Sequence, residues 1–438
     1  MKRRRVLALL LSAFIGVSAS VPVYADVAQA KAQVSQETIG EEVTGADLAS
    51  QIASASKGDV IKLTADTNAS TKGLIVEKGQ DVTIDTNGHV LTLANSDDGN
   101  LKVYGKLTII DSTGKGSVES HTQYTPTVGN SKGKVLSTAA TTGQAMIEVC
   151  GSGALQIGKG ASVVQDAEPW TGADTTSLYR YGNTAIGLTG SSKVTVDGGS
   201  IKAGSYAIRV YDKQSLYRLD RKETVDSVEV IVKSGKVVSE NNSAISAKAD
   251  GEDSKAKVTV SGGTVTGGIN GVEVYSQDVT VTGGTITTTG TEAGETDNCT
   301  NMTGDTALFI GGFAQSSKVS ISGGTFKAPA DVPAVLDEGM TNVTYNYLCG
   351  IYDIKGGTYT AEVHSRQMQP GYINKKNSDG LWVVTAGKAT PTPTPKVSPK
   401  PTTAGPTKKP TPTPAGKRVK YSELNLDGKC SLKNLLGV

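Results

Sequence analysis

The middle of the chain repeats a short pattern of apolar and polar residues. In each copy the two types alternate over four positions, a glycine-centred break follows, and the copy ends on an apolar residue. Strict alternation predicts a β-strand with one buried face, and the glycines allow a sharp bend that a β-carbon would resist. The copies run over Val194–Ile201, Val230–Val237, Val258–Val265, Val279–Ile286, Val319–Phe326 and Tyr352–Tyr359.

The spacing of these copies indicates how the strands are arranged. The second glycine of the unit falls at positions 199, 235, 263, 284, 324 and 357, so the gaps are 36, 28, 21, 40 and 33 residues. The shortest gap fits one turn of a three-sided coil, and the longer gaps imply insertions. Because no helical pattern separates the strands, we predict an all-β, right-handed parallel β-helix. A β-sandwich built from antiparallel repeats is the alternative, since the spacing is irregular.

Both ends of this repetitive region carry candidate caps. Thr44 or Asp47 can begin a short helix in which Leu48, Ile52 and Ala55 share one face. We expect this helix to cover the first coil, because a solenoid otherwise exposes its terminal core. At the other end, the segment 371–384 has the form of a hairpin, and we expect its Trp382 to pack over the last coil.

Together, the short helix, the V-x-V-x-G-G-T units and the closing GY…DG-x-W-x-V segment resemble the pectate-lyase-like β-helix modules of bacterial surface and secreted proteins. The resemblance covers residues 44–386, which we take as the β-helix domain. It implies a polysaccharide or cell-surface ligand. It also implies an alternative activity, that of a divergent polysaccharide lyase or glycoside hydrolase acting on pectin-like uronans. Repetitive motifs of this kind describe architecture more than activity.

The first residues predict export. Lys2 to Arg5 are positive, residues 6–17 are apolar, and Val23-Tyr24-Ala25 offers small residues before Asp26. A short apolar run followed by such a site predicts a cleaved signal peptide at residues 1–25. Residues 26–43 would then be a flexible leader. We expect a secreted protein, extracellular or at the cell surface, with no transmembrane segment once the signal is removed.

Charge and composition limit the classes of partner and the kind of core that the chain can have. Removal of residues 1–25 leaves 40 Lys and Arg against 42 Asp and Glu, a net charge of −2, which argues against nucleic acid. Aromatic residues make up only 5% of the chain, so Val, Ile, Leu and Ala must form the core, which a thin stack permits. No zinc spacing joins the cysteines, and their disulfide state stays open. They are Cys150, Cys299, Cys349 and Cys430.

Beyond the β-helix the composition changes. Residues 387–416 are rich in Pro and Thr and predict an extended linker. In the tail, 417–438, alternating oxygen-bearing side chains precede Gly428, as in a calcium loop. The candidate ligands are Glu423, Asn425, Asp427 and Asn434, with Ser431 between them. The tail resembles half of a dockerin, which implies Ca²⁺ and a cohesin-like scaffold as partner. It departs from that family in its Glu at position 1, its Asn at position 12 and its lack of a second loop, so a vestigial tail is the alternative.

Candidate catalytic residues are few. Asp97-Asp98-Gly99 could supply acids, but a polar turn explains it better. Tyr179-Arg180-Tyr181 with Arg209, Arg218 and Arg221 could form a cationic sugar-binding patch, and Trp170 could stack on a sugar ring, although loop residues at the edge of the solenoid are the preferred interpretation.

At the second place of the repeat, where enzymes of this kind carry acids, the chain has hydroxyl side chains that we expect to face outward as a ladder. They are Thr195, Thr259, Thr280 and Ser320. Such a ladder favours a binding or spacer surface over an active site. The sequence therefore predicts a secreted β-helix protein without catalytic activity that binds a glycan or another surface.

Overall fold

The computed structural model describes residues 44–96, 98–121, 145–166, 184–211, 223–248, 255–290, 305–330, 332–341 and 347–387. All of them belong to the larger of two compact units, which spans residues 42–438.

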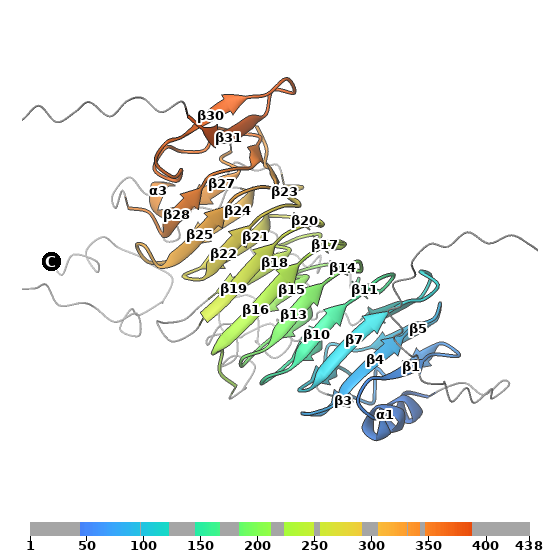
Figure 1. Ribbon diagram of the computed structural model, residues 1–438. Coiled ribbons are helices and arrows are strands. Elements are labelled where there is room, and N and C mark those ends of the chain that lie inside the picture. The colour runs from blue at the N-terminus through green and yellow to red at the C-terminus, as the bar shows by residue number, and fades with distance from the viewer. Residues whose placement is uncertain are drawn as a thin grey trace, which may run out of the picture. The chain divides into compact units, whose positions relative to one another are not determined.

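The first element is the helix α1, Gly45–Ser54, at the blue end of the ribbon (Figure 1). Thr44 is its N-cap: the Thr44 hydroxyl accepts from the Asp47 amide at 3.3 Å, and the Asp47 carboxylate accepts from the Thr44 amide at 3.1 Å. This capping box supplies partners for the Thr44 and Asp47 amides, and of the two predicted helix starts it selects Thr44. Leu48 and Ile52 are fully buried, and the helix packs against the first coil. The predicted capping helix is confirmed.

In the part of the chain that the structure describes, the strands form three sheets, here called A, B and C. Sheet A contains, in order, β1 Asp59–Lys62, β4 Asp81–Asp85, β7 Lys106–Ile110, β10 Ala154–Ile157, β13 Lys193–Val196, β16 Ser227–Val232, β19 Lys255–Val260, β22 Asp278–Val281, β25 Ser317–Ile321 and β28 Gly350–Ile354. Sheet B contains β2 Thr67–Asn68, β5 Val90–Leu93, β8 Ser117–Ser120, β11 Ser162–Gln165, β14 Ser200–Ala203, β17 Lys236–Ser239, β20 Thr264–Gly267, β23 Thr285–Thr288, β26 Thr325–Lys327, β29 Thr358–Tyr359, β31 Trp382–Ala386 and β30 Tyr372–Lys376. Sheet C contains β3 Leu74–Val76, β6 Leu101–Val103, β9 Ala145–Val149, β12 Thr184–Leu188, β15 Ile208–Val210, β18 Ile245–Lys248, β21 Asn270–Tyr275, β24 Thr306–Gly311 and β27 Val335–Asp337, which the short helix α3, Glu338–Thr341, follows.

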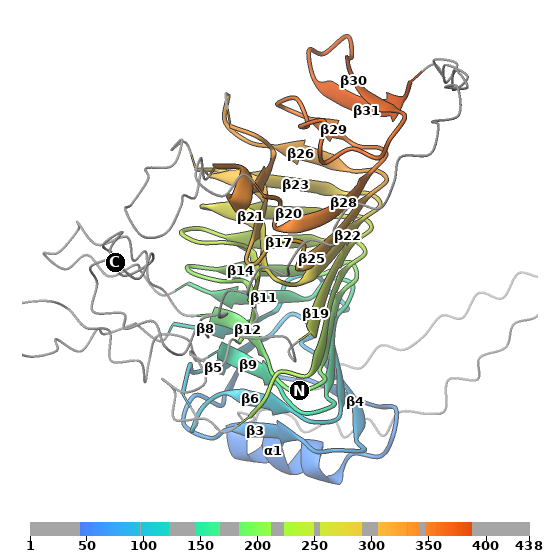
Figure 2. The same cartoon turned by 90° about the vertical axis from the view of Figure 1, so that its left-hand side faces the viewer.

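The chain visits the three sheets in turn and then starts the next coil, so each strand pairs with a strand three positions further along. Figure 2 shows the three sheets as separate sides of the stack. Among the described strands the pairing is parallel until the last hairpin, where β31 lies antiparallel to β29 and β30. The fold is therefore a right-handed parallel β-helix, as predicted, and the β-sandwich alternative is wrong.

The core is built from columns of small aliphatic side chains. On sheet A one inward column stacks Val194, Val230, Val258, Val279 and Val319, all of them buried. Burial of each Val or Leu side chain contributes about 1.5–3 kcal/mol, so a stack of many coils needs few aromatic residues. The composition predicted this kind of core.

The corner between sheets A and B is where the glycine pair of the repeat lies. Gly263 and Gly284 have φ angles of +72° and +82°, a region that residues with a β-carbon disfavour. The first glycine of the pairs 262/263, 283/284, 323/324 and 356/357 is required for a second reason, and in the pair 198/199 the two roles are exchanged. A β-carbon at Gly262 would lie 2.2 Å from the Lys233 carbonyl oxygen of the preceding coil. One glycine therefore supplies the turn, and the other lets adjacent coils approach.

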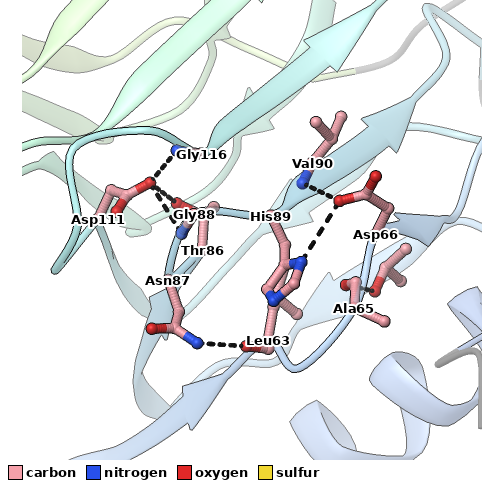
Figure 3. Close-up of polar contacts among 11 residues, drawn as sticks. Leu63, Ala65, Asp66, Thr86, Asn87, Gly88, His89, Val90, Asp111 and Gly116 are labelled. Atoms are coloured by element: carbon pink, nitrogen blue, oxygen red, sulfur yellow. Dashed lines mark hydrogen bonds and ion pairs between the residues drawn. The ribbon is translucent and has the colours of Figure 1, made fainter. Parts of the chain in front are cut away.

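The first coils make the same corner with side chains (Figure 3). The buried Asp111 carboxylate accepts from the Thr86 hydroxyl at 2.9 Å and from the Gly114 amide at 2.8 Å, and it also binds the Gly116 amide. Burial opposes its ionisation, but hydrogen bonds from Thr113, Thr86 and Gly114 hold the pKa of the Asp111 carboxyl well below its usual range. Across the same corner, the Asn87 side-chain amide donates to the Leu63 carbonyl at 2.9 Å. These bonds tie each coil to its neighbour.

The last hairpin, β30–β31, closes sheet B at the orange end of the ribbon (Figure 1). Tyr359 pairs with Trp382, which is partly buried and packs on the core. Lys376 places its Nζ 5.1 Å from the centre of the Trp382 ring. The predicted closing hairpin and the position of Trp382 are confirmed.

The corner glycines lead to a stability prediction. We expect Gly284→Ala to lower the free energy of unfolding by about 2 kcal/mol or more, because it adds an unfavourable φ and a β-carbon 2.7 Å from the Gly262 carbonyl oxygen. Gly380→Ala is the matched control, since its φ is +78° but no atom lies within 4 Å of the new β-carbon. Urea unfolding followed by circular dichroism measures both losses. Equal losses would show that the contact between the added β-carbon at position 284 and the neighbouring coil does not reduce stability.

Candidate functional site

The outer face of sheet A carries the predicted hydroxyl ladder. The strand register aligns Thr195, Thr259, Thr280 and Ser320, with Ile231 interrupting the column. Beside it runs a column of charges in which Lys193 and Glu229 form an ion pair of 2.9 Å, each side chain nearly half exposed. Exposed pairs of this kind contribute little stability. Thr259, Thr280 and Ser320 are partly exposed and Thr195 is buried, so the outer face of sheet A is solvated over most of the ladder.

Sheet C differs from the other two sheets. Its strands β9, β12 and β24 are buried at every described position, whereas strands of sheets A and B alternate between buried and accessible residues. The long connections of the chain also lead into or out of this sheet. Residues 122–144, 167–183 and 291–304 join sheet B to sheet C, and residues 212–222 join sheet C to sheet A. The repeat spacing is therefore uneven because the connections that enter and leave sheet C differ in length.

Polar and aromatic residues gather on the outward side of sheet C. The register brings Arg209, Ser246, Glu273 and Phe309 into one column, one residue from each of four successive coils. A second column, two residues further along each strand, contains Lys248, Tyr275 and Gly311. We refer to Tyr206, Arg209, Tyr211, Lys248, Glu273 and Tyr275 as the sheet C cluster.

Glu273 is the most buried charge of the cluster, with 8% of its side chain exposed. Its Oε1 lies 3.0 Å from Lys248 Nζ. Its Oε2 accepts from the hydroxyls of Ser243 at 3.0 Å and Ser246 at 3.1 Å. Because both oxygens have donors, hydrogen bonds and the ion pair offset the cost of burying this carboxylate.

Tyr275 lies against this ion pair. Lys248 Nζ is 4.8 Å from the centre of the Tyr275 ring, and the Phe309 ring is 5.5 Å away. Gly311 explains how the ring fits, because a β-carbon there would lie 2.4 Å from a Tyr275 ring carbon. Gly187 has the same role for the Tyr211 ring, at 2.5 Å. A glycine in the neighbouring coil thus lets each aromatic ring lie across the sheet.

Arg209 lies between two tyrosines. Its guanidinium carbon is 4.9 Å from the centre of the Tyr206 ring and 5.7 Å from that of Tyr211. Such cation–π contacts stabilise the cation by about 0.5–2 kcal/mol, depending on desolvation. Tyr206, Arg209, Lys248 and Tyr275 keep part of their surface accessible, and a third of the Lys248 side chain is exposed. The cluster therefore presents aromatic faces and two cations to solvent.

The protonation of the cluster follows from its surroundings. Burial alone would lower the pKa of Lys248, but the negative charge of Glu273 outweighs it and raises that pKa overall. Burial raises the pKa of the Tyr275 hydroxyl. Both groups therefore keep their protons at neutral pH and act as hydrogen-bond donors. A general base needs a pKa near the working pH, and neither group has one. Burial also raises the pKa of the nearby Glu338, whose carboxylate accepts from the Gly312 amide at 3.1 Å.

A second polar group lies where sheet B turns toward sheet C. His121 Nδ1 is 2.6 Å from Asp166 Oδ1 on the next coil, and His121 Nε2 is 3.3 Å from Glu119 Oε2. The hydrogen bond to Asp166 is the main cause that raises the pKa of His121 above 6.5, against a smaller opposing effect of burial. Within the described residues, no group of three or more His, Cys, Asp and Glu side chains is arranged to hold a metal ion.

Of the residues that the sequence singled out, Arg209 lies in the sheet C cluster. Asp98 and Gly99 lie in the turn after β5, where Gly99 accepts from the Ala94 amide at 2.7 Å, in agreement with the turn interpretation. Cys150 and Cys349 are buried, and the Cys349 thiol donates to the Gly312 carbonyl at 3.2 Å. The following lie outside the described residues: Asp97, Trp170, Tyr179, Arg180, Tyr181, Arg218, Arg221, Cys299, Cys430, Glu423, Asn425, Asp427, Ser431 and Asn434.

The sequence did not predict Lys248, Glu273 and Tyr275. The expectation that outward strand positions carry hydroxyls holds for sheet A, but sheet C carries an acid, a base and tyrosines instead. The glycines at 187 and 311 were the available signal, because each interrupts an apolar strand where a neighbouring ring needs space.

Comparison with protein-family models, with curated proteins and with solved structures yielded no match. No helix in the described ranges has the length and apolar character needed to cross a bilayer.

The Lys248–Glu273 pair leads to a second prediction. We expect Lys248→Met to lower the free energy of unfolding by about 1–2 kcal/mol, since it leaves Glu273 desolvated without its cation; the partial exposure of Lys248 keeps the loss below that of a fully buried pair. The control Lys193→Met breaks the exposed pair on sheet A and should cost about 0.5 kcal/mol or less. Thermal and urea unfolding compare the two variants. A loss for Lys248→Met no larger than that of the control would contradict this account of Glu273.

The histidine gives a prediction on pH. Because the pKa of His121 is raised above its ordinary 6.5, the contact with Asp166 stabilises the fold fully below about pH 6.5 and weakens as pH rises through the raised value. We expect His121→Gln to destabilise the protein more at about pH 5.5 than at about pH 8.5. In an Asp166→Asn background this pH dependence should shrink. Urea unfolding at the two pH values measures the loss. An equal loss for His121→Gln at both would refute the stabilising role of the His121–Asp166 contact.

Proposed function

We propose that the protein is a secreted or cell-surface β-helix of the pectate-lyase-like kind that binds a glycan through the sheet C cluster. The observation that carries the proposal is the grouping of partly accessible tyrosine rings with Arg209 and Lys248 on one face of sheet C. Aromatic faces pack against the apolar sides of sugar rings, and fixed cationic donors bind their oxygen atoms.

The protonation of the cluster favours binding over proton abstraction. Lys248 and Tyr275 both keep their protons at neutral pH, so they can donate hydrogen bonds but do not serve as bases. The close contact of Gly311 with the Tyr275 ring restricts this partly accessible ring before binding, which lowers the entropic cost of ordering it on the ligand. A preformed aromatic surface of this kind is suited to a repeating ligand.

The second candidate function is a divergent polysaccharide lyase or glycoside hydrolase. The observation in its favour is that Glu273, Lys248 and Glu338 belong to the same side of sheet C, and burial raises the pKa of Glu338 toward that of a general acid. The two candidates share a site and differ in whether the bound glycan is cleaved.

One experiment separates the two functions. The secreted full-length chain is titrated calorimetrically with a panel of neutral and acidic oligosaccharides, and the same mixtures are assayed for new reducing ends and for unsaturated products. We expect binding without cleavage. Tyr206→Ala and Arg209→Ala should each weaken binding by about tenfold, which corresponds to the loss of one stacking or charged contact.

Thr280→Ala on sheet A is the control and should bind as the unchanged protein does. Cleavage that depends on Glu338 would favour the second candidate. Binding that survives both cluster substitutions would place the glycan elsewhere and refute the proposal.

Calcium binding by the tail stays a prediction. If Glu423, Asn425, Asp427 and Asn434 form a loop, calorimetry of the full chain at millimolar Ca²⁺ should detect heat that Asp427→Ala removes. Attachment to a cohesin-like scaffold depends on the same loop.

A further inference from the structure

Sheet C ends one coil before its neighbours. In the described residues β27 is its last strand, whereas sheet A continues to β28 and sheet B to β29 and the closing hairpin. The place that a further strand of sheet C would fill is a cavity of about 750 Å³. It is lined by the β27 residues Val335, Leu336 and Asp337 and, across from them, by the segment 362–368 and β30.

The lining of this cavity is mainly apolar. Met340, Val363, Met368 and Tyr372 contribute to its wall, and so does Ile373, whose side chain is 49% exposed. A volume of this size accommodates a few side chains. An exposed isoleucine beside two methionines is an adaptable apolar surface that favours contact with another segment.

The backbone edge of β27 faces the same cavity. The side-chain amide of Gln367 donates to the Val335 carbonyl at 3.4 Å, which is a long hydrogen bond. In earlier coils of sheet C a backbone amide of the next coil occupies such a position, as where Thr189 donates to the Val149 carbonyl at 3.0 Å. Gln367 thus stands in for one donor of an absent strand, and the edge retains the geometry for strand addition.

We propose that the chain's own tail occupies this cavity, with Leu424-Asn425-Leu426 added to β27 as a short strand. The two leucines alternate with a polar residue, so both can point into the apolar lining while Asn425 faces solvent. The acidic neighbours Glu423 and Asp427 would then lie near β30, which carries Lys375 and Lys376. This inference does not depend on the proposed glycan site.

The length of the linker permits this contact. The last described residue, Gly387, donates to the Gly371 carbonyl at 2.7 Å, next to the Tyr372 that lines the cavity. From residue 388 to Leu424 the chain has ample length, about 110 Å if it adopts an extended proline-rich conformation. A tethered segment meets its site at an effective concentration on the order of a millimolar. A weak contact of three residues is therefore enough to keep the cavity occupied.

Hydrogen exchange of the full-length chain tests the proposal, in the presence of a chelator so that calcium binding by the tail does not contribute. We expect the double variant Leu424→Asp/Leu426→Asp to accelerate exchange in the peptide containing β27 about tenfold, because the added strand protects the edge amides. The control Thr402→Asp/Thr411→Asp adds the same charge to the linker and should leave exchange unchanged. An excess of a synthetic peptide of residues 418–428 should restore protection to the tail variant.

Three outcomes would overturn the proposal. The first is equal exchange of β27 in the unchanged, tail-variant and linker-variant proteins, which would show that the tail does not cover the edge. The second is protection that rises with protein concentration, which would assign the cavity to a second copy of the chain. The third is failure of the peptide to restore protection while the variant's β-helix remains folded by circular dichroism.

Discussion

The close approach of successive coils at the corner between sheets A and B is the constraint on which the structure depends. Parallel strands must lie about 4.8 Å apart to form their hydrogen bonds, and the corner has to keep that spacing while the chain turns. Glycine pairs such as Gly262 and Gly263 achieve this through backbone contact, and the Asp111 carboxylate achieves it through hydrogen bonds. Because this corner is short in every coil, variation in coil length is confined to the two corners that flank sheet C.

That asymmetry gives the three sheets different roles. Sheet A keeps a solvated outer face of hydroxyls and paired charges, whereas the outer face of sheet C has lost most of its contact with water. Desolvation makes the charges of sheet C interact strongly, so Glu273 requires Lys248 and two serine hydroxyls. The same low exposure shifts the pKa values of Tyr275 and Glu338 upward. The buried charges and shifted pKa values therefore concentrate on sheet C, the sheet that the long connections enter or leave.

The features that could be predicted are those fixed by nearby residues. The capping box of Thr44 and Asp47 spans four residues, and the Trp382 hairpin is also a local structure. The sheet C cluster could not be predicted in this way. Lys248 and Glu273 are a whole coil apart in sequence, and no repeated motif marks either residue. The signal peptide, the linker and the calcium loop stay predictions, since they fall outside the described residues.

The sequence by itself determined the strands, their buried faces and the parallel stack, because alternation and glycine spacing act over a few residues and repeat along the chain. Only the tertiary structure decided which outward side chains become neighbours. Coil length varies with each insertion, so residues at different distances in sequence come into register, as Ser246 does with Glu273 and Tyr275 does with Gly311. Their contacts, their desolvation and the protonation that follows are properties of the stacked coils, and the repeat alone does not encode them.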